Sequence, residues 1–345
     1  MSDYDESFQD DYDVVVVGGG AAGLNGALML VRARRSVLVI DAGEPRNAPA
    51  AGVHGLLARD GTPPAELLAA GRAEVRGYGG RVVRGRVAEI RRAGADFAVC
   101  LDGTRSVRAR RVLVATGVSD ELPDIPGLRE RWGRDLVHCP YCHGWEVRDR
   151  AIGVLAGGPV SVHQALLFRR LSADVTYFAQ GVAPAGDDAE RFAALGIRVV
   201  ATPIASVEAT DDRIVGVRLA NGELVSREVL TVAPRAVPRV DFLAPLGVRP
   251  VPHPSGMGGH VPADPVGRTE VPGLWIAGNA TDIVAQVGAA AAAGAMAGAQ
   301  INAELVTEDT ATAVAAYRAA FSVPFSAAAE RMVSELVLGD RRHGR

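Results

Sequence analysis

The chain has 345 residues, more than one hydrophobic core of ~250–300 residues accommodates, so we expect two domains. Hydrophobic residues make up 48% and charged residues 22% of the sequence, which excludes a disordered protein, and the net charge of −3 gives no reason to expect binding to nucleic acid or an anionic membrane. All 37 basic residues are arginine, so Schiff-base and P-loop enzymes, which need a lysine, are excluded.

The N-terminus is acidic, whereas a secretion signal needs basic residues and an apolar run, so we expect a cytoplasmic protein. Three cysteines, two of them in one motif, do not make a disulfide scaffold. Segment 283–303 carries no charge and is nominally long enough to span a bilayer. It is mostly Ala and Gly, interrupted by polar amides, so we expect a buried helix instead.

The first elements in the chain form one βαβ unit. Residues 12–17 are an apolar run that suits a strand buried on both faces, residues 24–33 have helical spacing, and residues 36–40 form a second strand. A further helix is expected at 63–77, short strands within 81–102, and a buried strand at 112–117. Prolines and a glycine at 123–127 suit a hinge between domains.

A second βαβ pattern follows in the middle of the chain. Its strands are expected at 151–155 and 175–178, with a helix near 162–171 between them. Further β-type runs lie at 198–200, 213–219 and 229–232. Residues 273–278 form one more strand entering a turn, followed by the Ala/Gly helix, so the chain returns to its first unit.

The first glycine turn has the pattern of a dinucleotide site. Gly18, Gly20 and Gly23 form G-x-G-x-x-G: the first makes the tight turn, the second lets backbone approach a pyrophosphate, and the third lets helix pack on strand. Asp41 stands at the end of the second strand. In this motif, an acidic residue about 20 residues after the glycines binds the ribose hydroxyls, and Asp41 lies close to that position. The motif alone does not choose between FAD and NAD.

Two later segments carry a resemblance to the flavoproteins with two dinucleotide-binding domains. Ala115-Thr116-Gly117, and the turn from Gly278 to Asp282 before the Ala/Gly helix, resemble the second and third FAD contacts of that family. The resemblance implies FAD, with Gly278 and Asp282 along the ribityl and pyrophosphate, and the helix from Gln286 and Val287 aimed at the flavin. Asn279 stands where the family commonly has Asp, and it can still accept a hydrogen bond from a ribityl hydroxyl.

Cys139-Pro140-Tyr141-Cys142-His143 is a C-x-x-C motif open to four interpretations. For zinc, which needs two more ligands, His138 and His143 stand too close in sequence to the cysteines, so we predict no metal. C-x-x-C-H is also the signature of covalent haem attachment, but that attachment is expected in an exported protein, and this sequence shows no export signal. Two structural cysteines are expected in a core rather than among turn-forming neighbours. We favour a redox-active dithiol, because a helix start and an imidazole lower a thiol's pKa from ~8.5.

A C-x-x-C near a hinge between two nucleotide-binding folds resembles the low-molecular-weight thioredoxin reductase family, over nearly the whole chain. The resemblance implies an α/β fold with two Rossmann-like dinucleotide-binding domains, each built as three layers (ββα). It also implies a homodimer. The FAD-binding domain would consist of two parts, residues 1–120 and residues 241–345. A domain that carries the C-x-x-C motif and resembles an NAD(P)H-binding domain would be inserted between them, at 121–240. Cys142 would lie nearest the flavin, and Cys139 would exchange with substrate.

His143 stands where thioredoxin reductases usually have an acidic residue. Cys-x-x-Cys-His-Gly resembles a branch of FAD-dependent dithiol oxidases that close disulfides in natural products such as gliotoxin and holomycin. With an unperturbed pKa of ~6.5, His is the better base for deprotonating a substrate dithiol. His138 could assist, and the remaining histidines are expected to be surface or structural: His54, His163, His253, His260 and His343.

The second glycine turn makes NADPH binding doubtful. At its first and third small positions it has Ala156 and Ser161, and only Gly158 sits where glycine belongs. The next strand ends at residues 177–181, without the arginines that pair with a 2′-phosphate. An unusual grip on NADPH would have to use other arginines, the candidates being Arg169, Arg170 and Arg235.

The sequence therefore predicts a FAD-dependent dithiol:disulfide oxidoreductase that oxidises a small-molecule dithiol through Cys139 and Cys142, with dioxygen as acceptor. The alternatives are an NADPH-dependent thioredoxin reductase acting on thioredoxin, a ferredoxin-driven disulfide reductase, and a non-enzymatic flavin-binding sensor. Tyr141 and Trp145 beside the motif suit an aromatic wall for a small molecule or a cover for the flavin.

Overall fold

The computed structural model describes residues 4–5, 7–102, 105–158, 160–321 and 326–338. The described residues up to Ile301 form one compact unit, and those from Asn302 form a second. The second unit consists of the C-terminal part of helix α6 (Val287–Phe321) and helix α7 (Ala327–Leu338).

A seven-stranded sheet has the order β3-β2-β1-β6-β5-β4, with β19 paired to β6. Its central strands are rich in Val, Ile and Leu and buried along most of their length, as expected of a parallel sheet covered on both faces. Its parallel strands are β1 (Asp11–Val17), β2 (Val37–Asp41), β3 (Arg81–Arg84), β6 (Ser106–Val114) and β19 (Leu274–Ile276). The antiparallel strands are β4 (Val87–Ala93) and β5 (Asp96–Leu101).

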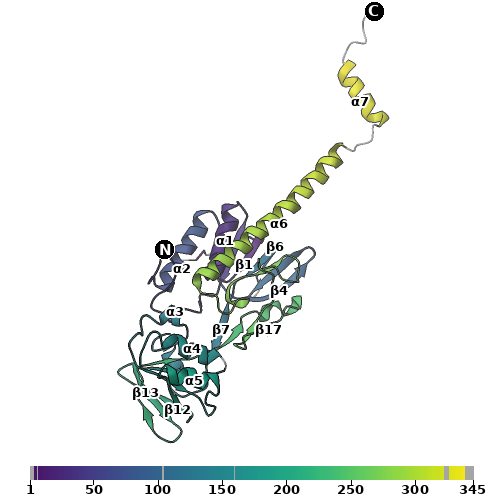
Figure 1. Ribbon diagram of the computed structural model, residues 1–345. Helices are drawn as coiled ribbons and strands as arrows, with labels where there is room; N and C mark the ends of the chain where they lie inside the picture. The colour runs from purple at the N-terminus through teal and green to yellow at the C-terminus, as the bar shows by residue number, and fades with distance from the viewer. Residues whose placement is uncertain (1–3, 6, 103–104, 159, 322–325, 339–345) are drawn as a thin grey trace, which may run out of the picture. The chain divides into compact units, whose positions relative to one another are not determined.

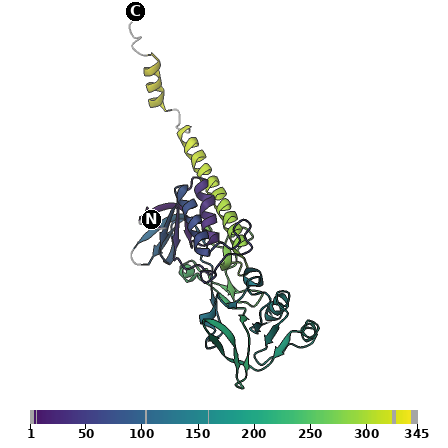
Figure 2. The same ribbon diagram turned by 90° about the vertical axis from the view of Figure 1, so that its left-hand side faces the viewer.

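The helices of this layer are α1 (Ala21–Arg32), α2 (Pro64–Gly77) and the first part of α6. Figures 1 and 2 show α1 and α6 side by side. Glycines allow this approach: a Cβ on Gly294 would lie 1.9 Å from the Ala22 carbonyl oxygen, and one on Gly298 would lie 2.5 Å from that of Gly26. Among the described helices, none combines the length and apolar character that a bilayer crossing requires.

A second, five-stranded sheet has the order β11-β10-β9-β15-β8, and all its pairs are parallel. Its strands are β8 (Leu136–Val137), β9 (Ile152–Leu155), β10 (Val175–Phe178), β11 (Arg198–Val200) and β15 (Val229–Thr231). The helices that follow its strands are α3 (Pro140–His143), α4 (Val160–Phe168) and α5 (Asp187–Ala194). An antiparallel sheet packs against it: β12 (Ile204–Thr210), β13 (Arg213–Leu219) and β14 (Leu224–Val225).

Shorter elements connect the two sheets. Strands β7 (Val118–Glu121) and β16 (Arg235–Pro238) pair as a two-stranded ribbon, and so do β17 (Val251–Pro252) and β18 (Gly259–His260). Short 3₁₀ turns are η1 (Arg129–Arg131), η2 (Asp241–Leu246) and η3 (Gly278–Ala280). The ribbon of β7 and β16 flanks the segment where the sequence predicts a hinge.

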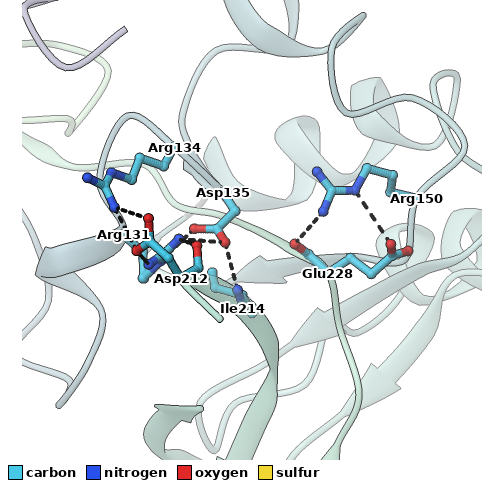
Figure 3. A network of polar contacts seen from close by, with 7 residues as sticks. All are labelled: Arg131, Arg134, Asp135, Arg150, Asp212, Ile214 and Glu228. Carbon is cyan, nitrogen blue, oxygen red and sulfur yellow. Dashed lines mark hydrogen bonds and ion pairs between the residues drawn. The ribbon is translucent and has the colours of Figure 1, made fainter. Parts of the chain in front are cut away.

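A charged network fixes the antiparallel sheet to its neighbour (Figure 3). The buried Arg131 donates to both carboxylate oxygens of Asp135, at 2.7 and 2.9 Å, and at 2.7 Å to Asp212 in the β12–β13 turn. Asp135 also accepts from the Ile214 N–H at 2.7 Å. Because each buried charge has partners, the network holds β13 beside β8 without an uncompensated ion.

Candidate functional site

One large cavity of about 1080 Å³ in the first unit is lined by residues from both sheets. This volume is at the upper end of the ~300–1,000 Å³ typical of ligand pockets. The predicted site residues on its wall are Gly18, Gly20, Asp41, Ala115, Thr116, Gly117, Cys139, Cys142, His143, Gly278, Gln286 and Val287. The structure therefore brings the glycine turn and the C-x-x-C motif to one cavity.

The glycine turn between β1 and α1 leaves backbone open toward this cavity. Gly18 has a φ of +107°, and a Cβ there would lie 2.5 Å from the Ala115 carbonyl oxygen. Gly23 packs rather than lining the wall, because its Cβ would lie 1.9 Å from the Gly18 carbonyl oxygen. At Gly20 a Cβ would meet nothing within 4 Å, and no side chain caps this first turn of α1. Such a turn suits the pyrophosphate of a dinucleotide.

Asp41 ends β2 beside this turn and is only 8% exposed. Its Oδ1 accepts from the Gly43 N–H at 3.1 Å, and its Oδ2 accepts from the Tyr4 hydroxyl at 2.8 Å. An ionised carboxylate accepts about four hydrogen bonds, so each oxygen retains capacity for a ribose hydroxyl.

The later segments fit a flavin dinucleotide at some positions and differ at others. The Thr116 hydroxyl oxygen is buried without a hydrogen-bond partner among the described residues, as expected of a group that a ligand satisfies. Asp282 is exposed, does not line the cavity, and accepts instead from the Val284 N–H at 3.2 Å. The Asn279 amide donates at 2.9 Å to the carbonyls of Asp282 and Ala285, so its NH₂ group shapes the turn that precedes α6.

Cys139 and Cys142 form a disulfide with their Cα atoms 5.2 Å apart. Cys139 is the N-cap of α3, and its sulfur accepts from the Cys142 N–H at 3.1 Å. The sequence predicts that a helix start lowers a thiol's pKa here. Since α3 has only four residues, the macrodipole contributes little, and this direct N–H contact is the local stabilisation of a Cys139 thiolate.

His143 follows the disulfide and is half-buried, with its Nε2 atom buried and without a partner among the described residues. Burial lowers the pKa of His143; the Glu146 carboxylate opposes this and a neighbouring His54 adds to it. The imidazole is therefore neutral near pH 7 and suited to accept a proton. His138 faces the Val232 carbonyl oxygen at 3.0 Å, and burial lowers its pKa too.

Sequence reasoning missed His54, which was expected to be a surface or structural residue. It lines the cavity, with Nδ1 3.4 Å from Asp60 and Nε2 3.5 Å from Glu146. It comes from a loop without periodicity, and no motif links it to His143, so the sequence contains no signal for it. Tyr4 was missed for the same reason.

The second glycine turn differs from the first. The Ser161 hydroxyl is buried and accepts from the Gly157 N–H at 2.9 Å, so this N–H is already occupied. At the end of β10 the Gln180 side chain accepts from the Ile204 N–H at 3.2 Å. Arg169 donates to the Leu195 carbonyl oxygen at 2.7 Å and Arg235 pairs with Glu121 at 2.6 Å. Pro159 lies outside the described residues.

Comparisons with known proteins agree with this architecture. A family model described as pyridine nucleotide-disulphide oxidoreductase matches residues 12–296. Thioredoxin reductase tcpT of Claviceps purpurea (strain 20.1) is 35% identical over 230 residues, 63% of this chain and 72% of the relative. Thioredoxin reductase sirT of Leptosphaeria maculans is 29% identical over 295 residues, 80% of this chain and 89% of the relative.

Solved structures show the same likeness. A crystal structure of HlmI has a TM-score of 0.85 and 45% identity, covering 92% of this chain and 99% of that chain. An oxidoreductase from Agrobacterium tumefaciens has a TM-score of 0.80 and 38% identity, covering 86% and 99%. The predicted fold class, two Rossmann-like domains in a thioredoxin reductase-like arrangement, is confirmed.

Proposed function

Because this chain belongs to the pyridine nucleotide-disulphide oxidoreductase family, an enzyme class, we propose that it is a FAD-dependent oxidase of small-molecule dithiols. Substrate thiols reduce the Cys139–Cys142 disulfide, and dioxygen is the final acceptor. The broader activity, thioredoxin reductase-like disulfide oxidoreduction, follows from the relatives. The finer proposal depends on how this chain treats nicotinamide coenzymes.

The observation that carries the oxidase proposal is the Ser161 hydroxyl bound to the Gly157 N–H. In a glycine turn that binds a dinucleotide, the backbone N–H groups are open to the pyrophosphate. Here an internal acceptor occupies one of them, and the side chain that supplies it is fully buried. The lack of arginine directly after β10 acts in the same direction, because a 2′-phosphate is normally held by a guanidinium.

Thiol exchange at the disulfide balances without a nicotinamide. A substrate thiol gives its proton to His143, and the thiolate attacks Cys139 Sγ, so that Cys142 leaves as a thiolate. The second substrate thiol loses its proton to solvent, and its thiolate attacks the substrate sulfur of the mixed disulfide. This releases Cys139 and a substrate disulfide, and the cysteine pair has gained two electrons. Bound FAD would supply the two-electron acceptor for the cysteine pair, and passage of the electrons to dioxygen, with the two substrate protons, would give hydrogen peroxide.

The residues proposed to hold FAD are those of the cavity wall. The open N–H groups after Gly20 would bind the pyrophosphate, Asp41 the adenosine ribose, and the unpartnered Thr116 hydroxyl a polar atom of the cofactor. Asp282 lies outside this wall and would contribute only its backbone, since its side chain accepts from the Val284 N–H.

The test compares two reductants under anaerobic conditions. A missing 2′-phosphate clamp forfeits charge-assisted hydrogen bonds worth ~1.5–3 kcal/mol each, so losing two weakens coenzyme binding by about 10²–10⁴-fold. We expect millimolar NADPH or NADH to bleach the flavin slowly or not at all. A small dithiol should bleach it quickly, and air should restore the yellow form with release of peroxide.

A double variant, Cys139→Ser with Cys142→Ser, is the control for direct reduction of the flavin by excess dithiol, and it should remain yellow. Rapid bleaching by micromolar NADPH, coupled to reduction of a thioredoxin, would contradict the oxidase proposal. It would support the second candidate, an NADPH-dependent thioredoxin reductase, which the names of the relatives favour.

A further inference from the structure

The N-terminal segment reaches the acid that ends β2. Asp5 attaches this segment to the edge strand β3: its N–H donates to the Val82 carbonyl oxygen at 2.7 Å, and its carboxylate accepts from the Val82 N–H at 2.8 Å. Arg81 adds an ion pair to the same carboxylate at 3.5 Å. The backbone next to Tyr4 is thereby held at one place on the sheet.

The Tyr4 ring is fixed from its own side as well. The guanidinium carbon of Arg72 lies 5.0 Å from the ring centroid, and that of Arg84 lies 5.8 Å from it. Both distances are within the range of cation–π attraction. With its ring held, the hydroxyl donates at 2.8 Å to Asp41 Oδ2.

This contact leaves the Asp41 carboxylate with a specific remaining capacity. The Gly43 N–H occupies one site on Oδ1, and the Tyr4 hydroxyl occupies one on Oδ2. A carboxylate oxygen accepts about two hydrogen bonds, so one site remains on each oxygen. Two neighbouring hydroxyls of a ribose need one acceptor site each, and the two fixed donors orient the carboxylate to offer them.

We propose that Tyr4 is a positioning residue for FAD: it fixes Asp41 in the rotamer that binds the adenosine ribose, and so couples the N-terminal segment to retention of the cofactor. This inference rests on the proposed binding of FAD. Burial, followed by the hydrogen bond to Asp41, raises the pKa of Tyr4, so the hydroxyl stays protonated and remains a donor across the physiological range.

The experiment measures cofactor affinity instead of turnover. Purified full-length protein is deflavinated, and dissociation constants for FAD and for FMN, which lacks the adenosine ribose, are measured by fluorescence for the wild type and for Tyr4→Phe. Loss of one hydrogen bond that orients the carboxylate should weaken FAD binding by about 3- to 10-fold. FMN binding should not change.

Tyr78→Phe is the matched control. The guanidinium carbon of Arg32 lies 5.0 Å from the Tyr78 ring centroid, and the Tyr78 hydroxyl accepts from Arg32 at 2.6 Å. Among the described residues, this hydroxyl has no hydrogen bond to Asp41. This variant should bind FAD like the wild type. In a Tyr4→Phe and Asp41→Asn double-mutant cycle, Tyr4→Phe should add little once the carboxylate is gone.

The outcomes separate the two proposals. If the wild type binds FAD and Tyr4→Phe binds it within twofold or more tightly, the role of Tyr4 is wrong and the FAD site stands. An equal loss for FMN and FAD would also contradict the role, because it would show a general loss of structure. If the wild type binds no FAD, the proposed function fails first and this inference fails with it.

Discussion

Two imidazoles of the cavity wall, those of His143 and His54, lie near carboxylates that are not part of the wall. His143 borders the disulfide, and His54 lies between Asp60 and Glu146. Burial lowers the pKa of His143, so the acid limb of the rate of flavin reduction by dithiol should lie below ~6.5. Above that limb the imidazole is neutral and accepts the thiol proton; below it the imidazole is protonated and the rate falls.

Substitutions on the two sides of His143 should move this limb in opposite directions. The Glu146 carboxylate raises the pKa of His143, so Glu146→Gln should move the limb to lower pH. His54 lowers that pKa, so His54→Gln should move it to higher pH. Stopped-flow reduction measured across pH is the test, with the exposed Glu190→Gln on α5 as control. Movement of both limbs in one direction would contradict the assignment of His143 as the base.

The two cysteines should also be distinguishable. If Cys142 is the sulfur next to the flavin, Cys139→Ser leaves its thiolate there and should give a long-wavelength charge-transfer band. Cys142→Ser should give none, and neither variant should turn over. Both side chains are half-buried and small, so the fold should persist, which circular dichroism checks. A band from Cys142→Ser alone would reverse the two roles.

At the scale of elements, the close packing of α1 against α6 depends on glycines, which have no side chain at the contact. Gly294→Ala would place a methyl group 1.9 Å from the Ala22 carbonyl oxygen, next to the turn proposed for the pyrophosphate. We expect a loss of roughly 1–3 kcal/mol or more in stability, with weaker retention of FAD. Gly288→Ala in the same helix is the control, because its Cβ would meet only Leu56 at 3.7 Å. Thermal unfolding of both variants tests this, and equal melting temperatures would contradict it.

Strands and helices with a strong pattern could be predicted, and weakly patterned ones could not. The valine run before Gly18 becomes β1, and the expected helix at 63–77 is α2 within one residue. Helix α5 has only eight residues and β12 mixes polar with apolar ones, so neither was predicted. A buried helix was expected over 283–303; α6 begins at Val287, alternates buried and exposed residues to 303, and continues to Phe321.

At the scale of the whole molecule, long-range contacts determine which distant segments of the chain come together, and sequence motifs do not indicate this. The motifs predicted which chemistry to expect, and parallel pairing of β19 with β6 returns the chain to the first sheet. That pairing supports our proposal of a cofactor domain made of residues 1–120 and 241–345, interrupted at 121–240. Glu146 follows His143 by three residues, but nothing in the sequence indicates that His54 meets them, because it comes from a separate loop much earlier in the chain.

The hydrogen bond from the Gly157 N–H to the Ser161 hydroxyl also affects how this chain could change by substitution. Building an NADPH site at this turn would need removal of that hydroxyl, and also arginines after β10, where the chain has Ala179 and Gln180. An open N–H without a phosphate clamp would leave the 2′-phosphate of NADPH unpaired, and a clamp beside an occupied N–H would hold only one end of this coenzyme. Since selection acts on single steps, neither change is favoured alone. If the oxidase proposal is correct, neither change alone should give a chain that NADPH reduces rapidly, and both are needed together.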